Sequence, residues 1–279
     1  MMNLQTSRGH LMVSFDSQAE VTNYIDPDLF EFQGESFVGE QNLDTWPKVY
    51  ARTQRDWQEG LYIIQEFVDE LLKQDIPEIK SHKRRVEFDE VEGDEVDLER
   101  LYQGQAAFRS SKREATTGPR ELTIMIDTTT PAFKDSKDIL WRGAAALALS
   151  SVLEEKGYSV EIWVVNGSAL FKGEWKSPVY TSCCLKRCSD PMDMSTLVNT
   201  VSGWCYRSVT FALLDTICKN FGKEREFGYG QCETPTMDDL DCISKDELRV
   251  YASGVFSFQG ALSMIQAELE KVVQLSENA

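Results

Sequence analysis

The feature that most constrains this chain is a strand, a helix and a second strand that follow one another in its middle third. Residues 122–126 form an apolar run without alternation, which is typical of a strand covered on both faces of a sheet. A helical pattern then extends from about Lys137 to Lys156, with Ser136 as its N-cap, and residues 158–165 predict the next strand. Because strands joined through a helix normally lie parallel, this order predicts an open, doubly wound, mostly parallel α/β sheet.

Later segments continue the α/β pattern. Residues 211–221 and 258–275 carry apolar side chains at helical spacing, and residues 248–252 predict a short strand. Between them, residues 223–247 show little periodicity. A stretch of that length without regular structure is typical of a functional or mobile loop.

The N-terminal part predicts a different organisation. An amphipathic helix is expected over residues 58–74, and the acidic stretch 87–99 predicts a short hairpin followed by a helix through Leu101. We therefore divide the chain in two. Residues 1–115 form a helical and hairpin α+β region that ends in a basic linker, and residues 116–279 form an α/β domain with flanking helices.

Charge limits the classes of partner. The chain has 29 basic and 46 acidic side chains, a formal net charge of −17, so its surface as a whole does not attract nucleic acid or anionic lipid. Eight of the acids lie between Glu87 and Glu99, where they predict a solvated face or a docking surface for a basic partner or Mg²⁺. The linker is the candidate nucleic-acid contact; its basic residues are Arg109, Lys112, Arg113 and Arg120.

Localisation and redox state follow from apolar runs and cysteines. No apolar run approaches the ~20 residues that cross a bilayer, and the first residues lack the apolar core of a signal peptide. We therefore expect a cytoplasmic protein with no membrane partner. The seven cysteines are odd in number and lack paired C-x2-C spacing, which predicts reduced, mostly buried thiols rather than zinc ligands.

Asp127 ends the first strand of the α/β domain, at the edge where open parallel sheets bind ligands. Thr128, Thr129, Thr130 and Pro131 follow it. Asp127 therefore occupies a candidate ligand-binding position. The simpler interpretation is that Asp127 forms a turn or caps the loop, a common use of aspartate.

These segments carry a family resemblance. The stretch Ile124-Met-Ile-Asp-Thr-Thr-Thr-Pro, with Trp141-Arg-Gly-Ala-Ala-Ala-Leu-Ala-Leu and Gly157-Tyr-Ser-Val-Glu-Ile-Trp, resembles a von Willebrand factor A-like domain. More narrowly, it is similar to an uncharacterised family encoded largely by bacteriophages and actinobacteria. Asp56-Trp-Gln-Glu-Gly and Gly93-Asp-Glu-Val-Asp are similar to the N-terminal part of that family. The resemblance covers most of residues 35–275.

The resemblance implies a Rossmann-like sandwich used for protein contacts rather than for chemistry. It implies that Asp127 and Thr129 match cation ligands of a D-x-S-x-S motif, in which Pro131 cannot supply the third hydroxyl. The distal threonine of the wider superfamily corresponds to Thr196 or Thr200, and the later T-D-G motif is absent. The metal site is therefore degenerate, and Mg²⁺ or another divalent cation is the one cofactor it suggests.

Catalytic motifs are scarce. The chain has only His10 and His82, so Ser-His-Asp and Cys-His mechanisms have almost no base to use. It has no Gly-rich phosphate-binding motif that follows a strand. A hydrolase would need the carboxylates of the 223–247 loop to fold over Asp127 and hold two Mg²⁺ ions. We expect no enzyme.

The leading hypothesis is a non-catalytic protein-interaction module, phage-encoded and acting in the host cytoplasm as an accessory subunit of a replication, transcription or AAA+ complex. We expect its partner contacts at the strand-end loop and at the acidic loop; these residues are Asp127, Thr128, Thr129, Thr130, Asp238, Asp239 and Asp241. One alternative is an accessory factor of phage DNA replication or transcription that contacts nucleic acid weakly through the basic linker. Another is a structural component of the virion.

Overall fold

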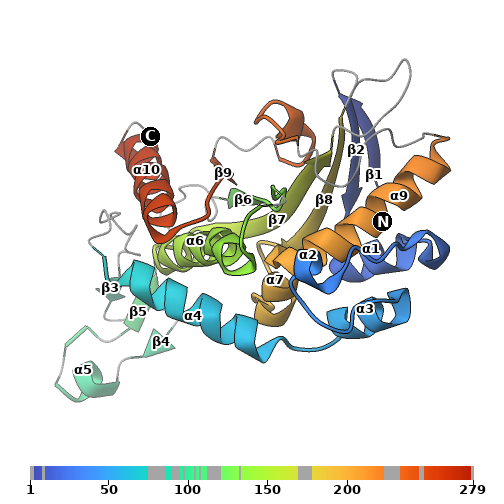
Figure 1. Ribbon diagram of the computed structural model, residues 1–279. Coiled ribbons are helices and arrows are strands. Elements are labelled where there is room, and N and C mark those ends of the chain that lie inside the picture. Colours follow the sequence, from blue (N-terminus) through green and yellow to red (C-terminus); the bar gives the residue numbers. More distant parts are fainter. Residues whose placement is uncertain are drawn as a thin grey trace.

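A six-stranded sheet forms the centre of the computed structural model (Figure 1). Its order is β1-β2-β8-β7-β6-β9, in which β2–β8, β6–β7 and β6–β9 are parallel and β1–β2 and β7–β8 are antiparallel. The mixed α/β class with a mostly parallel sheet and flanking helices is therefore confirmed. The strands are β1 Asn3–Ser7, β2 His10–Phe15, β6 Glu121–Asp127, β7 Ser159–Ser168, β8 Val179–Lys186 and β9 Arg249–Ala252. The structure describes residues 3–7, 10–74, 86–89, 95–96, 98–103, 105–106, 108–111, 121–131, 133–168, 178–222, 233–244 and 248–277.

The major helices pack on one face of this sheet. They share one apolar cluster with the inward residues of β2, β6, β7, β8 and β9. The helices are α1 Gln18–Tyr24, α2 Glu35–Val38, α3 Trp46–Thr53, α4 Gln58–Leu72, α6 Ser136–Glu155, α7 Met194–Val201, α8 Gly203–Cys205, α9 Phe211–Asn220 and α10 Phe258–Glu277. Short helical turns are η1 Pro27–Leu29, the π-helical η2 Tyr206–Thr210 and η3 Asp239–Cys242.

The expectation of a doubly wound sheet is wrong for the described residues. The opposite face carries a second, smaller cluster that includes Met12, Met125 and Trp163, and the segment 233–244 lies over it with Leu240 fully buried. The crossover helix α6 and the C-terminal helix α10 pack against each other rather than on opposite faces. The sheet is therefore covered by helices on one side and by an irregular segment on the other.

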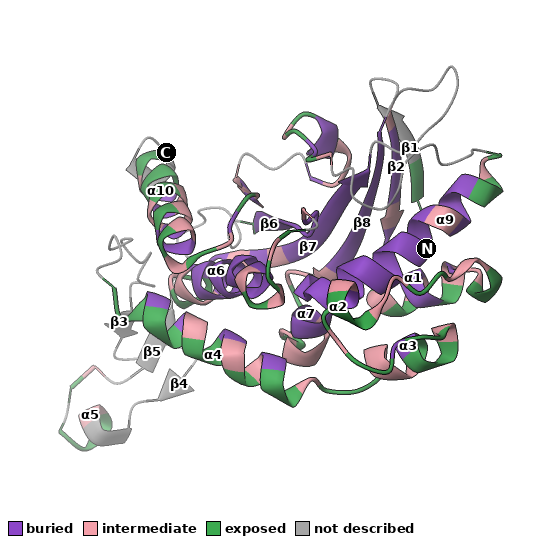
Figure 2. Cartoon of the chain, viewed as in Figure 1, coloured by how far each residue is buried: buried purple, intermediate pink, exposed green. Residues whose placement is uncertain are grey.

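Helix α6 is the centre of the helical layer. It packs against α4, α7 and α10 as well as β6 and β7, and it is buried over most of its circumference (Figure 2). A Cβ at Gly143 would lie 2.7 Å from Val201 Cγ2, so the glycine allows α7 to approach closely. The N-cap is Asp135, one residue before the expected Ser136; its side chain accepts a hydrogen bond from Lys137 N.

The N-terminal region shares the core of the α/β domain. Strand β2 pairs with β8, and α4 runs along α6 with Ile64, Val68 and Leu71 buried. Residue 115 is therefore not a boundary of the hydrophobic core. Periodicity predicted α4 correctly, whereas the pairing of β2 with β8, over a separation of more than 160 residues, left no local signal.

The predicted acidic hairpin is a different structure. Strands β3 Val86–Asp89 and β4 Glu95–Val96 do not pair with each other, because β5 Phe108–Ser111 lies between them in a three-stranded sheet; α5 is Leu98–Tyr102. Arg109 belongs to β5 rather than to a flexible linker, and only its backbone is described. Lys112, Arg113 and Arg120 lie outside the described residues.

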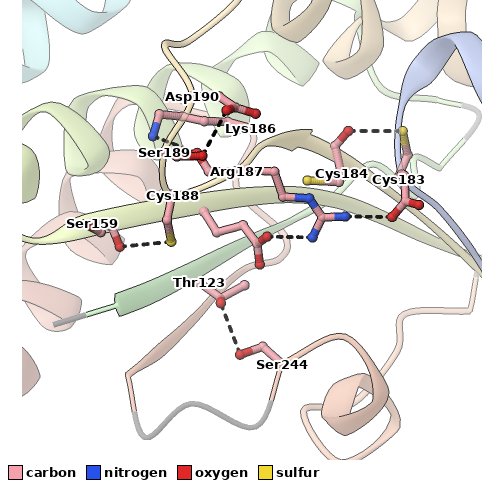
Figure 3. A network of polar contacts seen from close by, with 12 residues as sticks. Thr123, Ser159, Cys183, Cys184, Lys186, Arg187, Cys188, Ser189, Asp190 and Ser244 are labelled. Atoms are coloured by element: carbon pink, nitrogen blue, oxygen red, sulfur yellow. Dashed lines mark hydrogen bonds and ion pairs between the residues drawn. The ribbon is translucent and has the colours of Figure 1, made fainter. Parts of the chain in front are cut away.

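Ion pairs connect three strands at the edge of the sheet where β8 ends (Figure 3). Arg187 donates to Glu161 of β7 at 2.8 Å and to Asp16 after β2 at 2.6 Å. Lys186 is buried, donates to Val160 O and forms an ion pair with Glu154 of α6. Thr123 of β6 donates to Ser244, which fixes the 233–244 segment to the sheet (Figure 3).

We predict that Ile64→Ala lowers the stability of the whole chain. Ile64 of α4 is fully buried in the core that this helix shares with the sheet, so its truncation should cost about 2–5 kcal/mol in the free energy of unfolding. Chemical denaturation should show one shifted transition, because α4 and the sheet share a core. Tyr62→Ala, on the exposed side of α4, is the matched control. Two transitions of which only one moves would contradict a shared core.

Candidate functional site at the strand ends

The carboxyl ends of β6, β7 and β9 meet the amino ends of β2 and β8 at one edge of the sheet. This follows from topology, since β8 runs antiparallel to β7 and β2 runs parallel to β8. Asp127, Gly167, Tyr180 and His10 therefore all lie near this edge, where Asp127 pairs with Val165 and Gly167 pairs with Tyr180. The predicted position of Asp127, at the ligand-binding edge of an α/β sheet, agrees with this arrangement.

The residues after β6 form a buried, internally bonded loop. Asp127 is 3% exposed and its carboxylate accepts a hydrogen bond from Thr129 N at 2.9 Å. Thr128 donates from both its amide and its hydroxyl to Val165 O, while Thr129 Oγ1 accepts from Gly167 N at 3.0 Å. The three threonines are therefore buried connections to β7 and within the loop, not an exposed row of hydroxyls.

The Arg142 side chain of α6 donates hydrogen bonds to this loop. Its Nη1 donates to the carbonyls of Asp127 and Thr129 at 2.7 and 3.1 Å, and its Nη2 donates to Thr130 Oγ1 at 2.7 Å. The side chain is 1% exposed. A buried guanidinium needs oxygen partners in fixed directions, so these three contacts fix the shape of the loop.

A second buried arginine fixes the continuation of the loop. Arg207, on the π-helical turn η2, donates to the carbonyls of Phe37 at 2.7 Å and Lys134 at 3.0 Å, with a longer contact to Pro131 O. Its guanidinium also lies over the Phe37 ring. Single π-helical turns often occur at functional sites. Here the turn positions the Arg207 guanidinium against the backbone of the segment between β6 and α6.

The same loop exposes an aromatic side chain. Phe133 is 84% exposed, although its neighbour Lys134 is held by Arg207 through its carbonyl. The Lys134 ammonium lies 5.7 Å from the Phe133 ring centroid and 4.7 Å from that of Phe256, which follows β9. Sequence reasoning missed Phe133, because nothing in its sequence context distinguishes an exposed phenylalanine from a core one.

On the opposite face, titratable side chains form a row across the sheet. Tyr180 stacks on His10 with ring centroids 5.5 Å apart, and Asp239 Oδ1 lies 3.9 Å from His10 Nδ1. Burial, followed by the charge of Asp127, raises the pKa of Tyr251. Burial also raises the pKa of Asp127, against the opposing effects of Thr129 hydrogen bonds and the Arg142 charge. Asp127 and Tyr251 therefore lie in a buried polar environment that disfavours their ionisation.

Gly167 shows how closely this region is packed. A Cβ on Gly167 would lie 2.0 Å from Glu233 O and 2.7 Å from Tyr180 Cδ1. Its carbonyl accepts a hydrogen bond from Glu233 N. The segment 233–244 therefore lies directly on the end of β7.

A small cavity lies on the helical side of the strand ends. It has a volume of about 20 Å³ and is lined in part by Thr128, Asn166, Thr181 and Thr200. That volume holds about one water molecule. Thr200, one of the two candidate distal threonines, thus lies near Thr128, but its hydroxyl donates to Thr196 O; the Thr196 hydroxyl donates to Asp193.

The three aspartates of the 233–244 segment do not converge. Asp239 is buried and accepts from Thr236 N and Oγ1, Asp241 pairs with Arg249, and Asp238 is exposed. They therefore do not form the carboxylate cluster on Asp127 that a two-metal hydrolase requires. Within the part of the chain that the structure describes, no group of three or more His, Cys, Asp or Glu side chains is arranged to hold a metal ion.

Cysteines and large aromatics mostly serve packing. Six cysteines are described as free thiols, and Cys183, Cys184, Cys205 and Cys218 are buried, as predicted; Cys232 lies outside the described residues. Five large aromatic side chains are also buried; these are Trp141, Trp163, Tyr180, Trp204 and Tyr206. None of the described helices is long and apolar enough to span a bilayer.

We predict that native Cys184 and Cys205 resist alkylation at pH 8. Burial raises the pKa of each thiol to about 12, so only about one molecule in 10⁴ carries either thiolate at that pH. Mass spectrometry after iodoacetamide treatment should show modification of both residues only in denaturant. Partly exposed Cys188 is the internal control. Rapid native labelling of Cys205 would contradict its burial.

Comparison with known proteins gives one match. The model of a family described as a domain of unknown function (DUF7192) matches residues 5–253, from β1 to the turn after β9. No curated protein and no solved structure matches the chain.

Proposed function

The chain belongs to the DUF7192 family, and we propose that it is a non-catalytic protein-interaction module whose contact surface is the loop between β6 and α6. The observation that carries this proposal is Phe133, an 84% exposed aromatic on a loop that two buried arginines hold. An exposed aromatic on a preorganised backbone is the typical anchor of a protein interface.

Preorganisation is the first support. Arg142 and Arg207 together bond the backbone carbonyls of Asp127, Thr129 and Lys134, so the loop loses little conformational entropy when a partner binds. The neighbouring Phe256 and the Lys134 ammonium extend the surface around Phe133. The partner we expect has an apolar pocket for Phe133 and an acceptor for Lys134 at its rim.

The volume of the strand-end cavity is the second support. Space for about one water beside Thr128 leaves no room there for a substrate. Small-molecule sites have volumes of about 300–1,000 Å³. The strand ends therefore favour recognition across the loop surface over catalysis beneath it.

The resemblance to von Willebrand factor A-like domains agrees with this role. The β6–α6–β7 unit and the position of Asp127 at the strand end are the features on which that resemblance rests. A phage origin, a role in a replication, transcription or AAA+ complex, weak nucleic-acid contact through the basic segment and a place in the virion stay predictions.

Photo-crosslinking from position 133 tests the proposal. With benzoyl-phenylalanine in place of Phe133, irradiation of cells that make the protein should link it to one discrete protein. The same probe at Tyr62, 66% exposed on α4, is the matched control. Phe133→Ala should abolish co-purification of that protein and change the free energy of unfolding by less than about 0.5 kcal/mol. Identical adducts from positions 133 and 62, or none, would count against the loop as the interface.

A further inference from the structure

We propose that the guanidinium of Arg142 is the resident cation of the strand-end loop, and that Asp127 and Thr129 therefore organise this loop without a divalent metal ion. The resemblance implies a metal at these residues, and the geometry around Arg142 does not fit one. This inference concerns the loop itself and stands whether or not Phe133 binds a partner.

A divalent cation such as Mg²⁺ needs about six oxygen ligands in octahedral geometry. The candidate ligands here already accept hydrogen bonds within the protein. The Asp127 carboxylate accepts from Thr129 N, and Thr129 Oγ1 accepts from Gly167 N. Pro131 has no hydroxyl for the third position of the motif.

The two candidate distal threonines, Thr196 and Thr200, form hydrogen bonds at their own helix, α7, instead. The Thr200 hydroxyl donates to Thr196 O in its own helix, and the Thr196 hydroxyl donates to the Asp193 carboxylate that caps α7. Neither threonine is bonded to the Asp127 loop in the described structure. Among the residues that the structure describes, no second carboxylate joins Asp127 either, because Asp239 is bonded to Thr236 and Asp241 is paired with Arg249.

Arg142 supplies what a cation would supply. It is a positive charge, 1% exposed, bonded to the oxygens of Asp127, Thr129 and Thr130 at 2.7–3.1 Å. Its charge also acts on the Asp127 carboxylate. The guanidinium is covalently part of the chain and therefore cannot dissociate, as a metal ion can. It also keeps its positive charge at every physiological pH. The loop is therefore formed as soon as α6 packs on the sheet.

The test combines calorimetry with thermal unfolding. Titration of wild type with Mg²⁺ or Mn²⁺ should give no heat beyond that seen for Asp127→Asn, which keeps the shape of the side chain and removes its charge. The Tm of wild type should be equal in EDTA and in millimolar Mg²⁺. A stoichiometric binding heat in wild type that disappears in Asp127→Asn, or a Tm raised by Mg²⁺ only when Asp127 is present, would overturn the proposal.

Arginine variants test the other half of the claim. Arg142→Ala should lower Tm by about 5–10 °C, because three charge-assisted hydrogen bonds are lost and their oxygens stay buried. Added methylguanidinium should recover part of the loss, which a generally destabilised core would not show. Arg187→Ala, which removes a 42% exposed arginine with two carboxylate partners, is the matched control and should show little loss and no recovery.

If Arg142→Ala does not fold, Arg142→Lys keeps the charge and shortens its reach. We then expect a lower Tm and faster backbone amide exchange at residues 127–130 than in wild type. Wild-type Tm and loop exchange retained in Arg142→Lys would show that the guanidinium geometry does not hold the loop.

Discussion

The burial of Arg142 is the interaction on which the strand-end architecture depends. Helix α6 packs against the sheet, α4, α7 and α10, so each polar group on its buried side must find a partner inside the protein. For the Arg142 guanidinium those partners are the oxygens of Asp127, Thr129 and Thr130. The burial of Arg142 therefore links the packing of α6 to the shape of the loop that follows β6.

Arg207 extends the same constraint to the far side of the loop. It reaches from the π-helical turn to the carbonyls of Phe37 and Lys134, which connects α2, η2 and the segment before α6. Backbone carbonyls rather than carboxylates receive most of these bonds. The loop is thus held mostly through its main chain, and the exposed side chain of Phe133 is available for other contacts.

Local sequence patterns predicted the elements whose cause is local. Apolar periodicity located α4, α6, α9, α10 and the strands β6, β7 and β9 within a few residues. It missed β1, β2 and β8. Strands β2 and β8 pair with each other from distant parts of the chain, and β1 joins the sheet through its hairpin with β2. The predicted pairing of β3 with β4 was wrong because β5, which lies beyond the acidic run in the sequence, stands between them in the sheet. One signal for the site was present but unused. An arginine inside the apolar run of α6 must have buried oxygen partners, and Asp127–Thr130, at the end of the preceding buried strand, can supply them.

The buried arginines also affect the net charge of the protein surface. The formal charge of −17 includes Arg142, Arg207 and Lys186, all buried, so these three cations present little of their charge at the surface. Asp127 and Asp239 are the described acids that are buried to a similar extent. The surface is therefore at least as acidic as the composition indicates. A long-range field of this sign attracts a basic partner and repels a phosphate backbone, whereas the short-range contact that we propose at Phe133 is apolar. Charge would then govern the rate of encounter and Phe133 the lifetime of the complex, because steering acts before contact and buried aromatic area acts after it.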